Sequence, residues 1–287
     1  MTTDAMYTDA LNTAPAPALT WLYAPGDRPT TVAKALASGA HAVVVDLEDA
    51  VAPERKEYAR SATAELLTAH HPVPVHVRVN ALDGPYAGAD LLALTGLPGL
   101  AGLRLPKVTD PHQVVRVAEL TDSLPLFALL ESALAIERAY TLATAHPALR
   151  GLTLGEADLR ADLGASDSGL DWVRSRVVCA SRAAGLAPPT QSVYPDIRDV
   201  DGLAASCAHG RALGFLGRAA IHPRQLPVIE RAYLPDPAEV AAAEEIVKAA
   251  ESEGGGALAL PDGRFVDAAV VAAARRTLSL SERATRT

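Results

Sequence analysis

The feature that most constrains the fold is a regular alternation of apolar, strand-like runs with segments of helical periodicity. Eight such runs precede residue 224, and most of them are nearly continuous in apolar residues. Strands of that kind are typical of a parallel sheet covered on both faces. The strand-like runs span residues 19–26, 41–49, 74–80, 100–108, 126–131, 149–158, 189–195 and 215–223. The segments with helical periodicity span residues 30–39, 53–70, 86–97, 110–121, 132–145, 170–185 and 199–214.

This alternation predicts an α/β protein whose residues 18–235 form a (β/α)8 TIM barrel, because that fold needs eight strands and about 250 residues. The Ala- and Pro-rich residues 1–17 are expected to be a flexible N-terminal leader.

After Pro235 the pattern changes. An Ala- and Glu-rich helix is predicted over 236–253, followed by the glycines at 254–256, a turn at 261–263 and a last helix. We expect residues 236–287 to form a C-terminal helical arm or lid. The alternative is a segment that simply packs on the barrel.

The stretch 126–164 carries the first functional indication. Its two strand-like runs end in acids, Glu131 and Asp158, and a helix is predicted between them. Strand, helix and strand in that order form parallel neighbours, and barrels place their chemistry at the carboxyl ends of such strands. Two carboxylates that converge there repel each other unless a cation lies between them. We therefore predict a site for Mg²⁺ held by Glu131 and Asp158.

Arg78 is the first candidate for binding an anion. It alternates with His76 in the run 74–80, so both side chains should point into the barrel. A guanidinium there suits the oxyanion or carboxylate of an oxoacid. A structural ion pair with Asp46 or Glu48 is the alternative, and His76 is expected to be a core histidine.

Further charged residues follow neighbouring runs. Asp46, Glu48 and Asp49 are expected to orient water on the metal and to pair with Arg28 and Arg78.

Lys107 ends the fourth run. A charge-pairing role beside the metal is favoured over a Schiff-base lysine. Arg218 and His222 are candidates for contact with a phosphate or pantetheine. Three arginines of segment 170–185 are expected on a solvated helix face: Arg174, Arg176 and Arg182.

Composition excludes several classes of protein. With 26 basic and 34 acidic side chains the net charge is −8, which argues against nucleic-acid binding by phosphate neutralisation. Cys179 and Cys207 lack ligand spacing and are expected to be buried or half-buried free thiols. No secretory signal or membrane-spanning run is recognisable, so we expect no membrane association and a cytoplasmic location.

Several motifs together resemble one family, the citrate lyase β-subunit-like proteins of the malyl-CoA lyase and HpcH/HpaI aldolase superfamily. They span nearly the whole chain in the family's order. The motifs are YAPGDRPTTVAKALASGAHAVVVDLEDAV, VRVN, LPKV, LLESALAI, GLTLGEADLRADLG, QSVYPDI, GFLGRAAIHPRQ and GRFVDAAVV. The resemblance implies a TIM barrel, Mg²⁺, and lyase or Claisen-type chemistry on short carboxylic acids carried as thioesters. It also implies a homo-oligomer, a trimer.

By position in these motifs, the resemblance implies that Glu131 and Asp158 bind the metal and that Arg78 binds substrate. The resemblance also implies that Glu131 lies against the substrate. Asp267 matches an aspartate of the C-terminal lid, which in some members reaches a neighbouring subunit's site as acid or base. The chain departs from the family in GFLGR, where an acid is absent and Arg218 replaces a lysine. A proline usual near the lid aspartate is also absent.

We therefore expect a Mg²⁺-dependent carbon–carbon lyase with Arg78, Glu131 and Asp267 as catalytic residues. Its substrate would be a β-hydroxyacyl thioester of coenzyme A or a carrier protein, such as citryl-CoA or malyl-CoA. The products would be an acetyl-thioester and oxaloacetate or glyoxylate. Arg28 and Lys107 would help Arg78 and Glu131 to bind substrate.

Three other activities stay open. The first is a class II aldolase that uses no thioester, and the second is malate-synthase-like condensation or thioester hydrolysis. The third is a carrier-protein-dependent lyase subunit that is inactive alone. The barrel decides none of them.

Overall fold

The computed structural model describes residues 18–252 and 257–284, and the chain divides into two compact units between Glu230 and Arg231. The predicted leader at 1–17 and the predicted glycine hinge at 254–256 lie outside the described residues. We describe each unit by itself.

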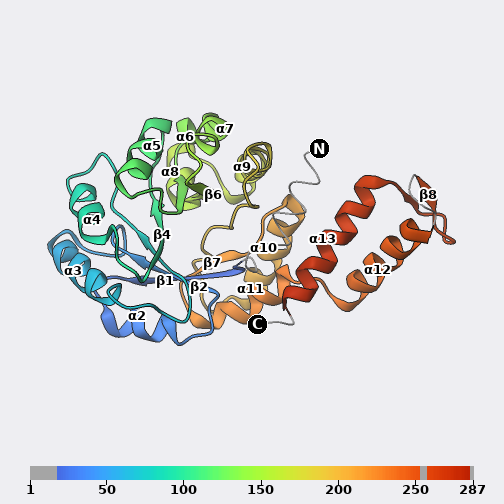
Figure 1. The fold of residues 1–287 in the computed structure, drawn as a ribbon, viewed down its shortest axis with the longest axis horizontal. Helices are drawn as coiled ribbons and strands as arrows, with labels where there is room; N and C mark the ends of the chain where they lie inside the picture. Colours follow the sequence, from blue (N-terminus) through green and yellow to red (C-terminus); the bar gives the residue numbers. More distant parts are fainter. Residues whose placement is uncertain (1–17, 253–256, 285–287) are drawn as a thin grey trace. The chain divides into compact units, whose positions relative to one another are not determined.

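The first unit is built on a curved sheet of seven parallel strands, which confirms the α/β class (Figure 1). The order across the sheet is β6-β5-β4-β3-β2-β1-β7. Valines on the side of the strands that packs against helices, such as Val43, Val45 and Val77, are fully buried. The strands are β1 (Thr20–Pro25), β2 (Ala42–Asp46), β3 (Val75–Arg78), β4 (Leu100–Leu105), β5 (Leu126–Leu130), β6 (Leu149–Leu154) and β7 (Arg218–Ala220).

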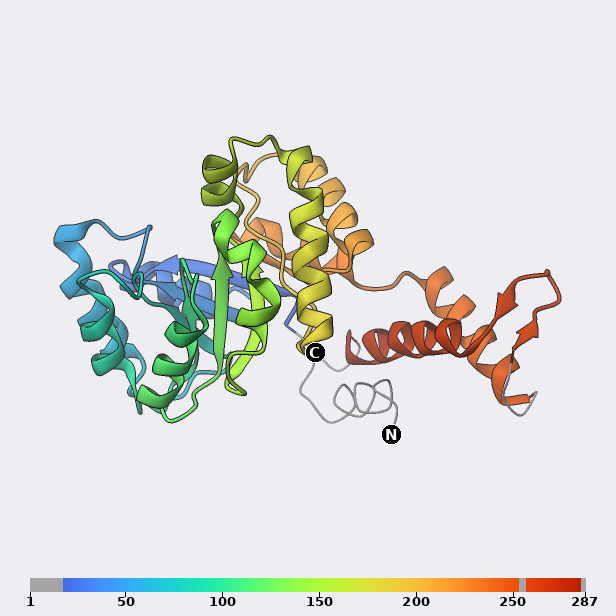
Figure 2. The same cartoon turned by 90° about the horizontal axis from the view of Figure 1, so that it is seen from above.

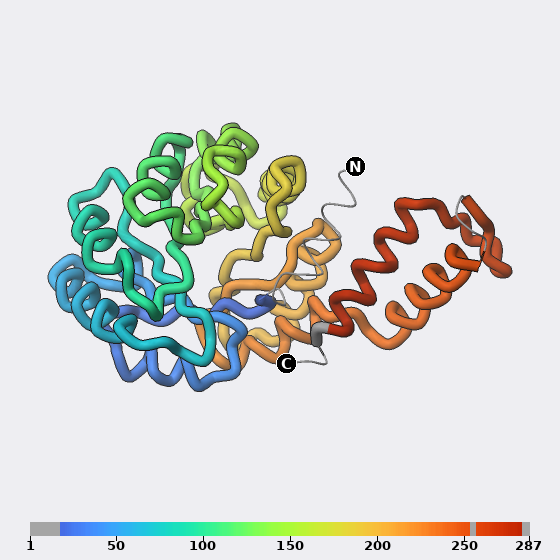
Figure 3. The backbone as a smooth tube through the Cα atoms, in the orientation of Figure 1, coloured from blue at the N-terminus to red at the C-terminus, as the bar shows by residue number. Residues whose placement is uncertain are grey.

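Helices surround the outer side of this curved sheet, as the ribbon and the tube show (Figures 2 and 3). In the described part of the chain, no helix is long and apolar enough to cross a membrane. The α-helices are α2 (Pro29–Leu36), α3 (Lys56–Leu66), α4 (Ala87–Leu94), α5 (Pro111–Leu120), α6 (Ala133–Glu137), α7 (Ala139–Ala143), α8 (Glu156–Leu163), α9 (Asp171–Ala183), α10 (Val200–Leu213) and α11 (Leu226–Tyr233). Short 3-10 turns are η1 (Pro53–Arg55), η2 (Asp167–Leu170) and η3 (Pro223–Gln225).

The run 189–195 differs from its prediction as a full strand. It makes two isolated parallel bridges, from Thr190 to Thr153 of β6 and from Gln191 to Arg218 of β7. Prolines on both sides of this segment have no N–H to donate to a ladder, which limits its pairing to these two residues. The two edge strands are nevertheless connected through this segment, an arrangement consistent with a TIM-barrel-like fold.

The run 149–158 was also predicted wrongly at its end. Strand β6 stops at Leu154, and Asp158 lies in the first turn of α8. Acidic side chains at this position interact favourably with the positive end of the helix. The predicted helix 132–145 is divided into α6 and α7 at Arg138, and α8 and α11 were not predicted.

The second unit contains α12 (Pro237–Ser252), a hairpin of β8 (Leu258–Ala259) and β9 (Phe265–Val266), and α13 (Ala268–Ala284). The hairpin strands are antiparallel and turn at the predicted position, 261–263. Helices α12 and α13 pack against each other. The role of this unit as an arm or lid stays a prediction.

Candidate active site

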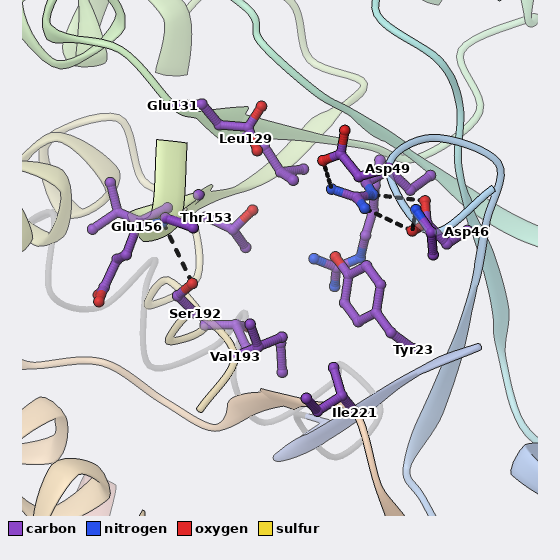
Figure 4. A pocket seen from close by; sticks show the side chains of 18 of the residues that line it. Tyr23, Asp46, Asp49, Leu129, Glu131, Thr153, Glu156, Ser192, Val193 and Ile221 are labelled. Atoms are coloured by element: carbon purple, nitrogen blue, oxygen red, sulfur yellow. Dashed lines mark hydrogen bonds and ion pairs between the residues drawn. The ribbon is translucent and has the colours of Figure 1, made fainter. Parts of the chain in front are cut away.

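A cavity of about 600 Å³ opens at the carboxyl ends of the strands in the first unit. Active sites of parallel barrels occupy this end, because the loops that follow the strands converge there. Figure 4 shows Glu131, Thr153, Tyr23 and Ile221 around this space. The cavity walls contain the predicted residues Arg28, Arg78, Glu131 and Asp158, together with Asp46, Asp49 and Arg104. The structure thus brings together four of the six predicted site residues.

Glu131 follows β5 directly and is buried, with 5 % of its surface exposed. Its Oε2 accepts a hydrogen bond from the backbone N–H of Lys107 at 2.9 Å. Its side chain lies against Gly155, where a β-carbon would come within 2.7 Å of Cδ and nearer still to Oε1. Burial raises the pKa of Glu131 to about 8, and the charges of Glu48 and Asp158 act in the same direction.

Asp158 lines the same cavity but is exposed, and it approaches from α8 rather than from a strand. No group of three or more His, Cys, Asp or Glu side chains placed to hold a metal occurs in 18–252 or 257–284. Two carboxylates are nevertheless enough for Mg²⁺, which keeps several waters and is usually bound by one or two carboxylates. Glu131 and Asp158 place two carboxylates on the wall of one cavity, and the charge of Asp158 adds to the effect of burial in raising the pKa of Glu131.

Arg78 forms the ion pairs that were considered as the alternative to substrate binding. Its Nε and Nη2 donate to Oδ1 and Oδ2 of Asp46 at 2.8 and 2.6 Å. Its Nη1 lies 2.9 Å from Oε2 of Glu48 and 3.4 Å from Oδ2 of Asp49. Burial alone would lower the pKa of Arg78, but the hydrogen bonds and charge of Asp46 outweigh it and raise the pKa. The charge of Arg78 is therefore balanced by acids while its side chain still lines the cavity.

Lys107 is paired as predicted, through Nζ, which lies 2.8 Å from Oε1 of Glu48. Arg28 lines the cavity and is exposed, and its expected pairing with the nearby acids is not seen among the described residues. Lys56 was not predicted: its buried Nζ donates to the carbonyls of Leu47 and Glu48 at 2.7 and 2.6 Å. This lysine anchors the backbone of the loop that carries the acids.

Arg104 is a second residue that we did not predict. It lies on β4 next to Arg78 in register, lines the cavity, and is 1 % exposed. The guanidinium carbon is 4.3 Å from the ring centroid of Trp21 and 5.2 Å from that of Phe127. Burial lowers the pKa of Arg104, and a hydrogen bond with Tyr23 acts in the opposite direction. A lone arginine in the apolar run 100–108 was a signal that could have identified it.

A buried ion pair supports α8. Nη2 and Nε of Arg174 donate to Oε2 and Oε1 of Glu156 at 2.7 and 3.0 Å. Arg174 is 4 % exposed, so the prediction that it lies on a solvated face is wrong. It points inward because Glu156, at the start of α8, offers a bidentate partner in the interior.

Three further predictions concern residues outside the cavity wall. His76 is a buried core histidine, as predicted, with its ring 5.0 Å from that of Trp21. Arg218 is buried and donates to Oε1 of Gln191 and Oγ of Ser206, so it is not placed to reach a phosphate. Cys207 is buried as expected, whereas Cys179 is exposed.

Asp267 belongs to the second unit, immediately before α13. Its Oδ1 accepts a hydrogen bond from the backbone N–H of Val270 at 2.9 Å. This is the bond of a helix N-cap, so Asp267 has a structural role in its own unit. Its predicted role as acid or base stays a prediction.

Comparisons with known proteins agree with the motifs. Residues 19–223 match the model of a family described as HpcH/HpaI aldolase/citrate lyase. A (3S)-malyl-CoA thioesterase of Cereibacter sphaeroides is 36 % identical over 91 % of this chain and 93 % of that protein. A citrate lyase subunit beta-like protein of Deinococcus radiodurans is 34 % identical over 94 % of this chain and 99 % of that protein.

Solved structures show the same similarity. The protein CitE of Mycobacterium tuberculosis, in complex with magnesium, acetoacetate and coenzyme A, superposes with a TM-score of 0.80. It is 34 % identical, and the match covers 93 % of this chain and 98 % of that one.

Proposed function

The chain belongs to the HpcH/HpaI aldolase/citrate lyase family, and from this membership we propose that it is a Mg²⁺-dependent carbon–carbon lyase. Its reaction is the cleavage, or in reverse the formation, of a β-hydroxyacyl thioester to an acetyl-thioester and a 2-oxoacid. The observation that carries the proposal is the cavity at the carboxyl ends of the strands, whose wall contains Glu131, Asp158 and Arg78 together.

Glu131 and Asp158 are the proposed metal ligands. When bound, Mg²⁺ would polarise the oxygen of the oxoacid half and balance the two carboxylates. Glu131 is held for this role by a hydrogen bond from the backbone N–H of Lys107 and by the close approach of its side chain to Gly155, which has no β-carbon. Support comes from the CitE structure, which is a complex with magnesium, acetoacetate and coenzyme A.

Charged side chains around the cavity would orient the substrate. Arg78 would lie against the oxygen on which negative charge develops, because its guanidinium lines the cavity and is fixed by Asp46. Arg28 and Lys107 are proposed to bind the anionic part of the substrate. Asp267 is proposed to move the proton at the carbon next to the thioester carbonyl, as the family resemblance implies.

Thioester hydrolysis is a second candidate activity, favoured by the relative named a (3S)-malyl-CoA thioesterase. The two activities release different products from one malyl thioester: a lyase yields acetyl-thioester and glyoxylate, whereas a hydrolase yields malate and free thiol. Product analysis with malyl-CoA and citryl-CoA therefore separates them.

The test of the metal site uses Glu131→Gln and Asp158→Asn. Each should reduce Mg²⁺-dependent cleavage at least about 100-fold and leave thermal unfolding nearly unchanged. Glu137→Gln is the matched control, because Glu137 is an exposed acid on α6 outside the cavity wall. Activity unchanged in both site variants would refute the assignment.

The carrier of the acyl group, assembly as a homotrimer and a cytoplasmic location stay predictions. Analytical ultracentrifugation tests the assembly, and comparison of coenzyme A thioesters with carrier-protein thioesters tests the carrier.

A further inference from the structure

Arg104 carries a positive charge in the interior with no acid to balance it among the described residues. Its Nε and Nη2 have no hydrogen-bond partner in 18–252 or 257–284, and the side chain is 1 % exposed. An unpaired buried charge costs several kcal/mol relative to water. A fold that only needed to fill this position with a long side chain would be better served by methionine or leucine. The arginine is therefore placed for something other than packing.

The surroundings of Arg104 are aromatic and polar rather than acidic. Trp21 and Phe127 lie within 4.3 and 5.2 Å of the guanidinium carbon and offer ring faces that tolerate a cation. Tyr23 contributes a hydroxyl that hydrogen-bonds with Arg104. Both Arg104 and Tyr23 lie in the wall of the cavity.

Thr153 completes this part of the wall from β6. Its Oγ1 is buried and has no hydrogen-bond partner. Figure 4 shows the hydroxyl ends of Thr153 and Tyr23 extending toward the same space from opposite sides. Among the described residues, the Thr153 hydroxyl and two nitrogens of Arg104 thus lack hydrogen-bond partners at one cavity, which indicates a missing acceptor.

The neighbouring arginine behaves differently. Arg78 is balanced by Asp46, Glu48 and Asp49, with its closest oxygen at 2.6 Å. The proposed reaction already assigns the Arg78 guanidinium to the oxygen on which negative charge develops, and three acids offset its charge. A second anionic group of a bound molecule would find in Arg104 a buried guanidinium that no acid of the described residues offsets.

We propose that Arg104, Tyr23 and Thr153 form a carboxylate subsite that makes the cavity selective for dicarboxylic over monocarboxylic oxoacids. The carboxylate would accept hydrogen bonds from the guanidinium and the two hydroxyls. The inference rests on the proposed function for the nature of the substrate, since the metal acids would hold the other end of the same acid. The oxoacid half of the natural thioester then carries a second carboxylate.

Binding of stable substrate mimics tests the subsite without turnover. Malate and lactate are 2-hydroxy acids that share the metal-chelating end and differ by one carboxylate. Isothermal titration calorimetry with the full-length protein, with Mg²⁺ and with EDTA, gives the affinity ratio of malate to lactate. We expect the protein to bind malate at least about 10-fold more tightly than lactate. In Arg104→Met, malate should lose about 10- to 100-fold in affinity and lactate less than about 2-fold.

Variants distinguish this role from a structural one. Arg104→Met should keep or raise the melting temperature, because it removes an unpaired buried charge. The matched control is Arg218→Met, which removes a buried arginine that donates hydrogen bonds to Gln191 and Ser206 and does not itself line the cavity. It should lower the melting temperature and leave the malate-to-lactate ratio unchanged. Tyr23→Phe and Thr153→Val should each reduce malate binding about 3- to 10-fold, and they test the subsite even where Arg104→Met does not fold.

A ratio of malate affinity to lactate affinity near one in the unmodified protein would overturn the inference. So would an equal loss of malate and lactate affinity in Arg104→Met, or a ratio that Tyr23→Phe and Thr153→Val leave unchanged. The proposed function can fail independently of this inference. In that case the protein would not cleave thioesters in the presence of Mg²⁺, but it would still prefer malate to lactate, and this preference would still depend on Arg104.

Discussion

Gly155→Ala is the substitution that most directly tests how the metal acids are held. Gly155 stands between β6 and α8, with φ −95° and ψ 79°, a conformation that alanine also adopts. Backbone strain is therefore not expected. The added methyl would instead meet Glu131, with Cδ at 2.7 Å and Oε1 and Cγ closer still.

The displacement follows from these contacts. Ordinary contact for a β-carbon begins at 3.4 Å, so the Glu131 carboxyl group must move by roughly 1 Å. A displacement of this size at a reacting centre typically costs about 100-fold in rate. We expect Gly155→Ala to lower kcat/KM for Mg²⁺-dependent cleavage about 100-fold. The melting temperature should fall only a little, since the methyl displaces one side chain of the cavity wall that can move toward the cavity.

The assay combines steady-state kinetics, Mg²⁺ titration and thermal unfolding. Gly88→Ala is the control, because Gly88 lies inside α4 and an added β-carbon there meets nothing within 4 Å. It should leave activity unchanged and stabilise the helix by up to about 1 kcal/mol. Wild-type activity in Gly155→Ala would refute the placement of Glu131 at the reacting centre.

Three other substitutions give distinct outcomes. Burial lowers the pKa of His76 to about 3, so the ring stays neutral in the folded protein near pH 5 but becomes protonated in the unfolded chain. Stability should therefore fall by roughly 1 to 2 kcal/mol from pH 6.5 to pH 5, a loss that urea unfolding of His76→Phe should not show. Arg174→Met leaves the carboxylate of Glu156 buried and unpaired and should cost about 3 to 5 kcal/mol in the same assay. Asp267→Asn keeps an N-cap for α13, so the melting temperature should hold while turnover falls at least about 100-fold.

Each of these predictions has a contradicting result. A steeper or equal pH dependence in His76→Phe would show that other groups cause the loss of stability. The double variant Glu156→Gln/Arg174→Met should recover part of the stability, and no recovery would mean that the pair itself is not the cause. Turnover in Asp267→Asn at the wild-type rate would remove Asp267 from the mechanism.

Most of the fold was predictable because apolar periodicity is local. Segments such as 42–45 and 126–130 are strands because every residue in them is apolar, and burial on both sides of a parallel sheet demands this. The run 189–195 was misjudged because its prolines restrict pairing. The end of β6 was misjudged because GEAD continues the strand-like run with residues that equally suit the first turn of a helix.

The residues of the site were predictable where an acid at a strand end or a family motif identifies them. Glu131, Asp158, Arg78 and Arg28 all reach one cavity, as expected from their positions after parallel strands. Which charges balance one another was not predictable, because ion pairs join residues far apart in the chain. Arg174 was assigned to solvent, although it pairs with Glu156, 18 positions earlier.

Local patterns in the sequence were enough to establish the class of fold, the end of the sheet where the acids gather, and the family. These properties depend on the local alternation of apolar and polar residues and on the order of the motifs along the chain. The folded structure was needed to show that three acids neutralise Arg78, whereas Arg104 is buried with no acid beside it among the described residues. Desolvation and charge pairing depend on which side chains meet across neighbouring strands. These contacts join residues that are distant in the chain, so the sequence alone does not distinguish a paired arginine from an unpaired one.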